Sequence, residues 1–200
     1  MVLLVLHLLF ARIADYTQGS GHREYELKMI ITISGAPGTG TTTLARGLAA
    51  ELHLRWVNSG KLFRKIATEK NISVKEMNHL AEKGPEIDYL IDDAQKALAK
   101  DGPGIFEGRL SGHLLDADLR VLLKADLKER AERISKRESK LLEDAMHETR
   151  IREESEARRY KMYYNIDIND FSTYDLVVDT CKFNEAGTIA VVLAAVRACH

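Results

Sequence analysis

A glycine-rich segment has the clearest capacity for chemistry in this sequence. It consists, in order, of Gly35, Ala36, Pro37, Gly38, Thr39, Gly40, Thr41, Thr42 and Thr43. Glycines let the backbone turn tightly and aim its N–H groups inward, where they bind phosphate oxygens with help from the start of a following helix. Three glycines in the six residues from Gly35 to Gly40 exceed what a simple strand-to-helix turn requires. The segment therefore predicts a phosphate-binding loop.

Two threonines within this segment bear on metal binding and on a missing positive charge. The hydroxyl of Thr42 stands where the Ser or Thr of such loops ligates Mg²⁺. Thr41 stands where the same pattern has a lysine, which normally neutralises charge shared by the β- and γ-phosphates of a nucleoside triphosphate. Another cation must replace that lysine for efficient phosphoryl transfer. Glu107 ends a predicted strand and could organise Mg²⁺ through water. It could also pair with Arg109, and the two roles are compatible.

Two arginines are candidates for holding the phosphate of a second substrate. Arg109 directly follows a predicted strand, and Arg64 lies on the helix after the second predicted strand. Residues just beyond the carboxyl ends of parallel strands face the crevice where ligands bind. The planar fork of arginine grips phosphate oxygens with two N–H groups and stays charged. The alternative for both residues is an ordinary surface position.

Charged residues are also concentrated between positions 150 and 161. The basic residues are Arg150, Arg152, Arg158, Arg159 and Lys161, and the acidic ones are Glu153, Glu154 and Glu156. One interpretation is a solvated helix with ion pairs between neighbouring turns. The other is a mobile segment that closes over a phosphoryl-transfer site, supplies positive charge and excludes water. The local sequence favours neither interpretation.

Other polar residues carry less information. Asp88 and Asp92 share one face of a predicted helix, and we interpret them as solvated charges rather than a metal site. The seven histidines show no metal-binding spacing. Cys181 and Cys199 fit neither a zinc site nor a disulfide framework, which favours a reducing compartment.

The elements that must position these residues alternate between strand and helix. The pattern predicts strands at 30–34, 56–58, 104–107, 119–123 and 176–178. It predicts helices at 42–52, after a cap at Ser59, through 71–100 with a break at Gly84-Pro85, through 126–164, and from 185 onward. This alternation predicts an α/β fold: a five-stranded parallel sheet covered by helices on both faces.

Composition is that of an ordinary globular chain. The sequence has 200 residues, of which 45% are hydrophobic and 30% charged, and its net charge of −1 gives no basic field toward nucleic acid or membrane. The apolar run 2–10 is too short to span a bilayer and lacks a basic segment before it. We therefore interpret residues 1–28 as an extension outside the fold and 29–200 as one domain, and we expect a cytoplasmic monomer.

From Met29 nearly to its end, the sequence resembles the archaeal-type cytidylate kinases, a branch of the nucleoside monophosphate kinase group of P-loop proteins. The resemblance rests on the order and spacing of several short segments. These are 31–35 before the loop, 59–64, 85–88, 107–110, 130–134, 152–157 and 174–177.

The resemblance implies a P-loop fold that binds ATP and Mg²⁺ at the glycine-rich loop and transfers the γ-phosphate to CMP or dCMP. It implies a helical acceptor-binding region near 60–100 and a lid near 138–165. Arg64 and Arg109 would contact the cytidylate. The transferred phosphate would be surrounded by Arg130, Arg152, and Arg158 or Arg159. Some archaeal members of the family also have threonine in place of the loop lysine.

Two other functions stay open at this stage. A kinase for AMP, UMP, dephospho-coenzyme A or shikimate would use the same loop and lid, and only the acceptor pocket would differ. An ATP-binding regulator without transfer activity is the second alternative, and the threonine at position 41 is the feature in its favour.

Overall fold

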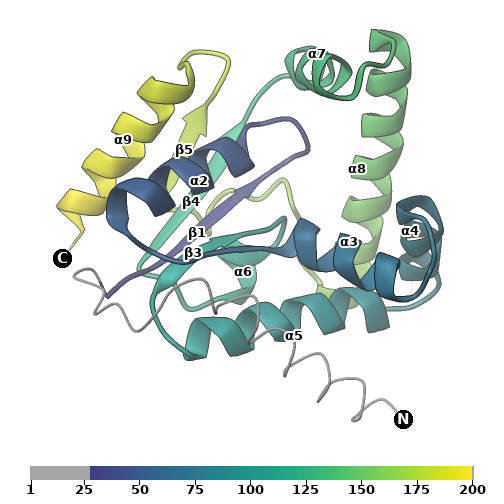
Figure 1. The fold of residues 1–200 in the computed structure, drawn as a ribbon, viewed down its shortest axis with the longest axis horizontal. Coiled ribbons are helices and arrows are strands. Elements are labelled where there is room, and N and C mark those ends of the chain that lie inside the picture. Colours follow the sequence, from purple (N-terminus) through teal and green to yellow (C-terminus); the bar gives the residue numbers. More distant parts are fainter. Residues whose placement is uncertain (1–27, 200) are drawn as a thin grey trace.

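The computed structural model describes residues 28–199, and the predicted extension lies outside them except for Lys28. Figure 1 shows strands and helices alternating along the chain. The strands are β1 (Ile30–Gly35), β2 (Trp56–Asn58), β3 (Gly104–Glu107), β4 (Leu119–Lys124) and β5 (Leu176–Asp179). The helices are α2 (Thr41–Leu52), α3 (Ser59–Glu69), α4 (Val74–Lys83), α5 (Glu86–Lys100), α6 (Ser111–Leu114), α7 (Leu127–Glu138), α8 (Leu142–Tyr164) and α9 (Glu185–Ala198).

The five strands form one parallel sheet in the order β2-β3-β1-β4-β5, which confirms the predicted fold class. β1 lies between β3 and β4, so the loop after β1 opens at the middle of the sheet's carboxyl edge. Ile33 of β1 pairs with Glu107 of β3. This register brings the end of β3 beside the glycine-rich loop, at the place where parallel α/β sheets bind ligands.

Helices cover both faces of the sheet, as its apolar strands require. On one face, α2 and α9 pack side chains such as Leu48 and Val192 against Ile31 and Val121 of the sheet. On the other face, α3, α4 and α5 enclose Phe106, which is fully buried. Both clusters are apolar and continuous, so the sheet is a rigid base for the loops at its carboxyl edge.

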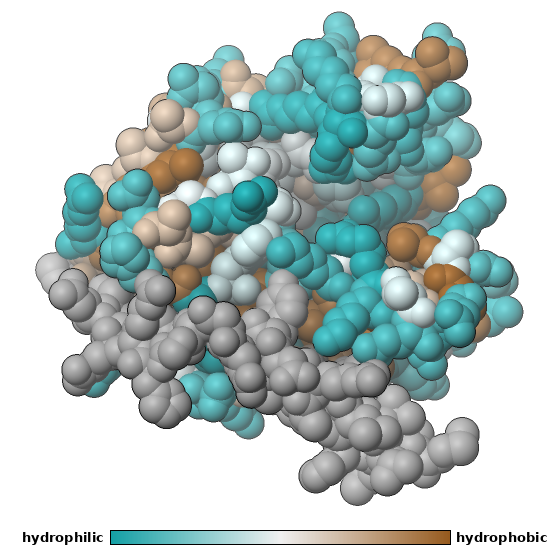
Figure 2. Space-filling view, in the orientation of Figure 1, coloured by the Kyte–Doolittle hydropathy of each residue, from teal (hydrophilic) through white to brown (hydrophobic). Residues whose placement is uncertain are grey.

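The charged stretch 126–164 forms two helices rather than one. Ser139 adopts a left-handed backbone with φ of 52°, which ends α7, and Leu141 is extended before α8 begins. A small apolar contact of Ala131 and Ile134 with Ala145 joins the two helices. In Figure 1, α8 stands apart from the sheet and runs from α7 toward α4 and α5. Hydrophilic residues dominate the surface around α7 and α8 in Figure 2.

Two helix starts refine the sequence-based boundaries. The cap predicted at Ser59 is wrong: Asn58 is the N-cap of α3, because its extended backbone lets its side chain accept a hydrogen bond from the Lys61 N–H at 2.7 Å. The helical stretch predicted from 71 begins at α4, which Ser73 and Glu76 start with reciprocal capping bonds. The predicted break at Gly84-Pro85 is confirmed. No helix within residues 28–199 is long and apolar enough to cross a membrane.

Candidate active site

The glycine-rich loop joins the end of β1 to the first turn of α2. Gly38 and Gly40 have φ values of 86° and 94°, a left-handed conformation that favours glycine. Gly40 is the N-cap of α2, and no side chain caps this helix or places a carboxylate in its first turn. The N–H groups of the first turn are therefore left for an anion, and the partial positive charge of the helix start favours phosphate there.

The carboxylate of Glu107 collects four hydrogen bonds at the end of β3. Its Oε1 accepts the hydroxyls of Thr41 at 2.9 Å and Thr42 at 2.6 Å. Its Oε2 accepts the indole N–H of Trp56 at 3.0 Å and the side-chain amide of Asn58. The alternative in which Glu107 pairs with Arg109 is wrong, because the guanidinium of Arg109 forms its ion pair with Glu156.

These bonds leave Thr42 suited to a cation. A hydroxyl that donates its hydrogen to a carboxylate keeps its lone pairs for another partner, and the Thr42 hydroxyl does so at the mouth of the loop. Residues 28–199 contain no group of three or more His, Cys, Asp or Glu side chains that could hold a metal ion. The Thr42 hydroxyl, with the Glu107 carboxylate behind it, offers oxygen donors of the kind that Mg²⁺ prefers, since this ion commonly takes few protein ligands and completes its shell with water and substrate phosphates.

A cavity of about 1020 Å³ extends from the loop in two directions. Toward β5 and α9 it is lined by Thr180, Phe183, Asn184 and Thr188. Toward α3, α5 and α8 it is lined by polar and charged side chains, among them Arg64 and Arg109. Its volume lies at the upper end of ordinary ligand pockets, which run from ~300 to ~1000 Å³. The loop thus lies at the centre of a space with room on either side for a small molecule.

Three arginines and two carboxylates meet on the side of the cavity toward α5 and α8. Glu156 Oε2 lies 3.2 Å from Arg109 Nε, and Glu156 Oε1 lies 2.8 Å from Arg152 Nε. Arg159 Nε lies 3.1 Å from Asp88 Oδ2, and both side chains are buried. With three positive and two negative groups, the cluster keeps one net positive charge. This arrangement favours an anionic ligand beside the loop.

The carboxylate of Glu156 stays ionised in this cluster. Burial by itself would raise the pKa of Glu156, but the guanidinium groups of Arg152 and Arg109 outweigh burial and hold that pKa below its ordinary value. Glu156 therefore keeps two arginines aimed at one place. Arg64 also lines the cavity, and it forms no ion pair with any of the described residues.

The interpretation of Asp88 and Asp92 as solvated charges is wrong. Asp88 is 7% exposed and pairs with Arg159, while Asp92 is half-buried and accepts a hydrogen bond from the Tyr164 hydroxyl. Burial raises the pKa of both carboxyls, that of Asp92 to about 6. Their spacing correctly indicated one face of α5, but α8 covers that face, and the sequence pattern did not show this.

Arg130 and Arg158 do not line the cavity, unlike Arg152 and Arg159. Arg130 is buried and forms a two-pronged pair with Glu153 at 2.6 and 3.1 Å. It also donates to the Pro37 carbonyl at 3.3 Å, so it ties the loop to α7 and α8. Arg158 is exposed on α8. Their predicted places around a transferred phosphate stay predictions.

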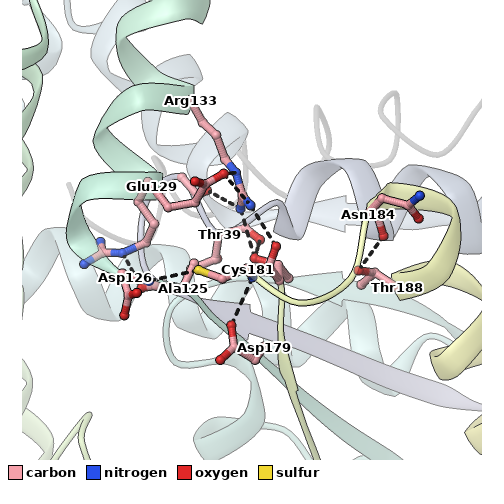
Figure 3. A network of polar contacts seen from close by, with 12 residues as sticks. Thr39, Ala125, Asp126, Glu129, Arg133, Asp179, Cys181, Asn184 and Thr188 are labelled. Carbon is pink, nitrogen blue, oxygen red and sulfur yellow. Dashed lines mark hydrogen bonds and ion pairs between the residues drawn. The ribbon is translucent and has the colours of Figure 1, made fainter.

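The sequence analysis did not identify two arginines of α7, Arg133 and Arg137, that line the cavity. Arg133 donates to the Gly38 carbonyl at 3.3 Å and to the Thr180 hydroxyl at 2.9 Å, and Figure 3 shows it reaching toward Thr39. Thr180 in turn donates to the Thr39 carbonyl at 3.1 Å. Arg137 lines the cavity one turn further on. The signal that could have revealed them is two arginines four residues apart on the helix that follows the fourth strand.

Comparisons with known proteins assign the fold and the family. A family model described as "Cytidylate kinase-like family" matches residues 30–182. The chain belongs to the cytidylate kinase-like family. A protein named cytidylate kinase from Methanothrix thermoacetophila is 66% identical over 170 residues, which are 85% of this chain and 99% of that protein. Another of that name from Archaeoglobus fulgidus is 46% identical over 84% of this chain and 95% of its own length.

Solved structures share the fold at low sequence identity. A shikimate kinase from Bacteroides thetaiotaomicron aligns with a TM-score of 0.56 at 12% identity, covering 86% of this chain and 99% of its own. An uncharacterised protein from Eubacterium ventriosum aligns with a TM-score of 0.65 at 16% identity, over 85% of this chain and 99% of that one. The solved structures therefore agree with the fold, while the family model and the relatives named cytidylate kinase confirm the family resemblance seen in the sequence.

The loop geometry predicts unequal costs for two glycine substitutions. Gly38→Ala and Gly40→Ala both force a left-handed backbone on alanine, which costs ~1–2 kcal/mol. At Gly38 the new Cβ would also meet the Arg130 carbonyl oxygen at 2.7 Å, whereas at Gly40 it meets nothing within 4 Å. Urea unfolding should therefore show a larger loss of unfolding free energy for Gly38→Ala. Equal losses would contradict the close approach of α7 to the loop.

Glu107→Gln should disturb the loop because both carboxylate oxygens of Glu107 accept hydrogen bonds, whereas a side-chain amide has only one oxygen that can accept them. Its N–H₂ group would face either the two threonine hydroxyls or the N–H donors of Trp56 and Asn58, and a buried unpaired donor costs ~1–3 kcal/mol. We expect lower stability, Mg²⁺-dependent turnover reduced at least about 10-fold, and changed fluorescence of Trp56, the one tryptophan in the sequence. Glu51→Gln, on the exposed side of α2, is the matched control and should change none of these.

Proposed function

We propose that this chain transfers the γ-phosphate of ATP to CMP and dCMP, giving ADP and the nucleoside diphosphate. The observation that carries the proposal is the continuous cavity between the phosphate-binding loop and the cluster of Arg109, Arg152 and Arg159. Relatives named cytidylate kinase support the choice of acceptor. A panel assay of ADP release with CMP, dCMP, UMP and AMP tests it. A rate with AMP or UMP more than tenfold above that with CMP would refute the assignment.

The loop and its neighbours would bind ATP. Its phosphates would lie on the N–H groups at the start of α2, and its adenosine would extend toward Phe183 and Asn184, since the other arm of the cavity holds the arginine cluster. Thr42 would hold Mg²⁺ directly and Glu107 would hold it through water. When bound there, Mg²⁺ would neutralise negative charge on the triphosphate.

The arginine cluster would bind the acceptor. Arg109, with Arg64, would grip the monophosphate, because guanidinium forks bind phosphate oxygens with two bonds. Arg152 and Arg159 reach the same space from α8 and would surround the phosphoryl group in transit. These residues position the reacting oxygens and balance charge, which is most of what phosphoryl transfer requires from a protein.

We propose that residues 138–165 act as a lid that moves together with the acceptor region. The Ser155 hydroxyl donates to Glu82 at 2.6 Å, and the Tyr89 hydroxyl donates to the Tyr163 carbonyl at 3.1 Å. These bonds fasten α8 to α4 and α5. Closure of this unit on the loop would exclude water, to which the phosphoryl group would otherwise be lost. The cytoplasmic location and monomeric state expected from the sequence stay predictions.

Arg109→Lys should impair use of CMP while sparing ATP. Lysine lacks the two-pronged grip on a phosphate and cannot keep the same ion pair with Glu156. Loss of a charge-assisted contact to the acceptor phosphate in a desolvated site costs about 2–5 kcal/mol. Steady-state kinetics should therefore show a sharp fall in kcat/KM for CMP with an unchanged KM for ATP. Arg150→Lys, at an exposed site on α8, is the control. Equal behaviour of the two variants would mean that Arg109 does not hold the acceptor.

Because Thr41 stands where related loops have a lysine, we predict opposite outcomes for two substitutions, a small effect of Thr41→Lys and a large effect of Arg152→Ala. Because arginines supply cations around the site, Thr41→Lys should change kcat by about tenfold or less, roughly 1.4 kcal/mol. Arg152→Ala should cost far more, since an arginine acting on a transferring phosphoryl group is worth about 10³–10⁵ in kcat. Single-turnover rates of the two variants measure both effects. A gain of several orders of magnitude from Thr41→Lys would instead favour an ATP-binding regulator.

A further inference from the structure

Helix α5 forms the wall of the acceptor side of the cavity. Three of its polar side chains, Asp88, Asp92 and Gln95, line the cavity, and their spacing of four and three residues places them on one face. The same part of the cavity is also lined by the apolar side chains of Phe63, Val74 and Ile91. Apolar sides with a few polar groups are typical of a slot for a flat heterocycle. Recognition of a base there depends on which polar group of this wall is free to bond its edge.

Two of the three polar side chains are already engaged. Gln95 donates to the Glu107 carbonyl at 3.0 Å and accepts the Ser111 hydroxyl at 3.3 Å, so both ends of its amide are used. Asp88 Oδ1 accepts a hydrogen bond from Arg159 Nη2 at 3.4 Å, and its Oδ2 forms an ion pair with Arg159 Nε at 3.1 Å without accepting a hydrogen bond. Neither can turn toward a ligand without breaking a buried polar contact.

Asp92 differs because one of its oxygens has neither a hydrogen bond nor an ion pair with any of the described residues. Its Oδ2 accepts the hydroxyl of Tyr164, and its Oδ1 accepts no hydrogen bond from any of the described residues. Tyr164 is held by edge-to-face contacts with Tyr89 and Tyr160, whose ring centroids lie 5.3 and 6.3 Å away. This aromatic support fixes the hydroxyl and thereby the carboxylate that it holds. Asp92 therefore offers a fixed free acceptor on the wall of the acceptor cavity.

The surroundings of Asp92 disfavour its charged form. Burial, and secondarily the neighbouring Asp88, raise the pKa of Asp92 to about 6, although the hydrogen bond from Tyr164 lowers it, so the ionised carboxylate is held at some cost in free energy. A hydrogen-bond donor from a ligand would offset part of that cost. Uracil presents the O4 acceptor where cytosine presents the N4 amino donor. A carboxylate oxygen at this place attracts cytosine and repels uracil.

We propose that Asp92 accepts a hydrogen bond from the N4 amino group of cytosine and so determines the preference for cytidylate over uridylate. This inference rests on the proposed function, since it requires a pyrimidine monophosphate in the acceptor arm of the cavity. Tyr164 acts as a positioning residue that holds the carboxylate in its orientation.

Asp92→Asn tests the proposal because it replaces one carboxylate oxygen, which accepts hydrogen bonds, by an N–H₂ group, which donates them. The Tyr164 hydroxyl can still donate to the amide oxygen, which turns the N–H₂ group toward the cavity, where it suits uracil O4 and opposes cytosine N4. We expect the ratio of kcat/KM for CMP to that for UMP to fall by about 10- to 100-fold, with an unchanged KM for ATP. Asp93→Asn makes the same chemical change one residue away, at an exposed site that does not line the cavity, and should keep the wild-type ratio.

A measurement on the wild-type protein covers the case in which Asp92→Asn does not fold. The monophosphate of pyrimidin-2-one riboside lacks only the 4-amino group of CMP, and its kcat/KM should be at least about 10-fold lower. Tyr164→Phe should lower the CMP-to-UMP ratio in the same direction as Asp92→Asn but less strongly, because the carboxylate remains.

The outcomes separate this inference from the function on which it rests. A wild-type protein that phosphorylates neither CMP nor UMP would refute the proposed function. A wild-type protein that prefers CMP, together with a folded Asp92→Asn variant of unchanged preference, would overturn only the role of Asp92. If the wild-type protein had the same kcat/KM for CMP and for the monophosphate of pyrimidin-2-one riboside, that role of Asp92 would be overturned as well.

Discussion

The site depends on the hydrogen bonds that the carboxylate of Glu107 accepts. It joins the end of β3 to both threonines at the start of α2 and to two side chains of β2. A buried carboxylate is stable only when donors surround it, and four donors from two other elements surround this one. The bonds orient the Thr42 hydroxyl and fix the first turn of α2. The same bonds account for Thr41, whose hydroxyl is engaged by Glu107 at the position where related loops have a lysine.

A second constraint is the balance of charge on the acceptor side. Arg109 follows β3 while Arg152 and Arg159 come from α8, and bringing the three together without anions would be unfavourable. Glu156 and Asp88 offset that repulsion without cancelling it. The five groups therefore hold one another in place, and their surplus positive charge favours an anionic ligand. Charged groups that are already held in place cost less to order when they stabilise developing charge.

Helix α8 connects these two constraints. Its buried face carries Glu156 and Arg159 into the cavity, while Tyr163 and Tyr164 attach it to α4 and α5. The Arg130–Glu153 pair attaches the same helix to α7 and, through the Pro37 carbonyl, to the phosphate-binding loop. One helix thus contacts the parts of the structure that would hold each substrate.

Local sequence determined the order of strands and helices, the phosphate-binding loop and the candidate arginines. These features follow from backbone preferences: glycines that adopt positive φ, β-branched strands, and helices with one apolar face. The break at Gly84-Pro85 was equally readable, whereas the cap at Asn58 was misplaced by one residue because Ser and Asn both make good caps.

Only the tertiary structure decided which polar groups meet. The partners of Glu107 lie 49 to 66 residues away in the sequence, and Arg159 lies 71 residues from Asp88. A pattern along one helix shows which residues share a face, but not what covers that face, so Asp88 and Asp92 looked solvated until α8 was seen to pack over them. The sequence specifies which chemical groups the side chains carry. The burial and partners that set its charge and direction come from contacts between segments far apart in the chain, because these depend on packing rather than on local backbone preference.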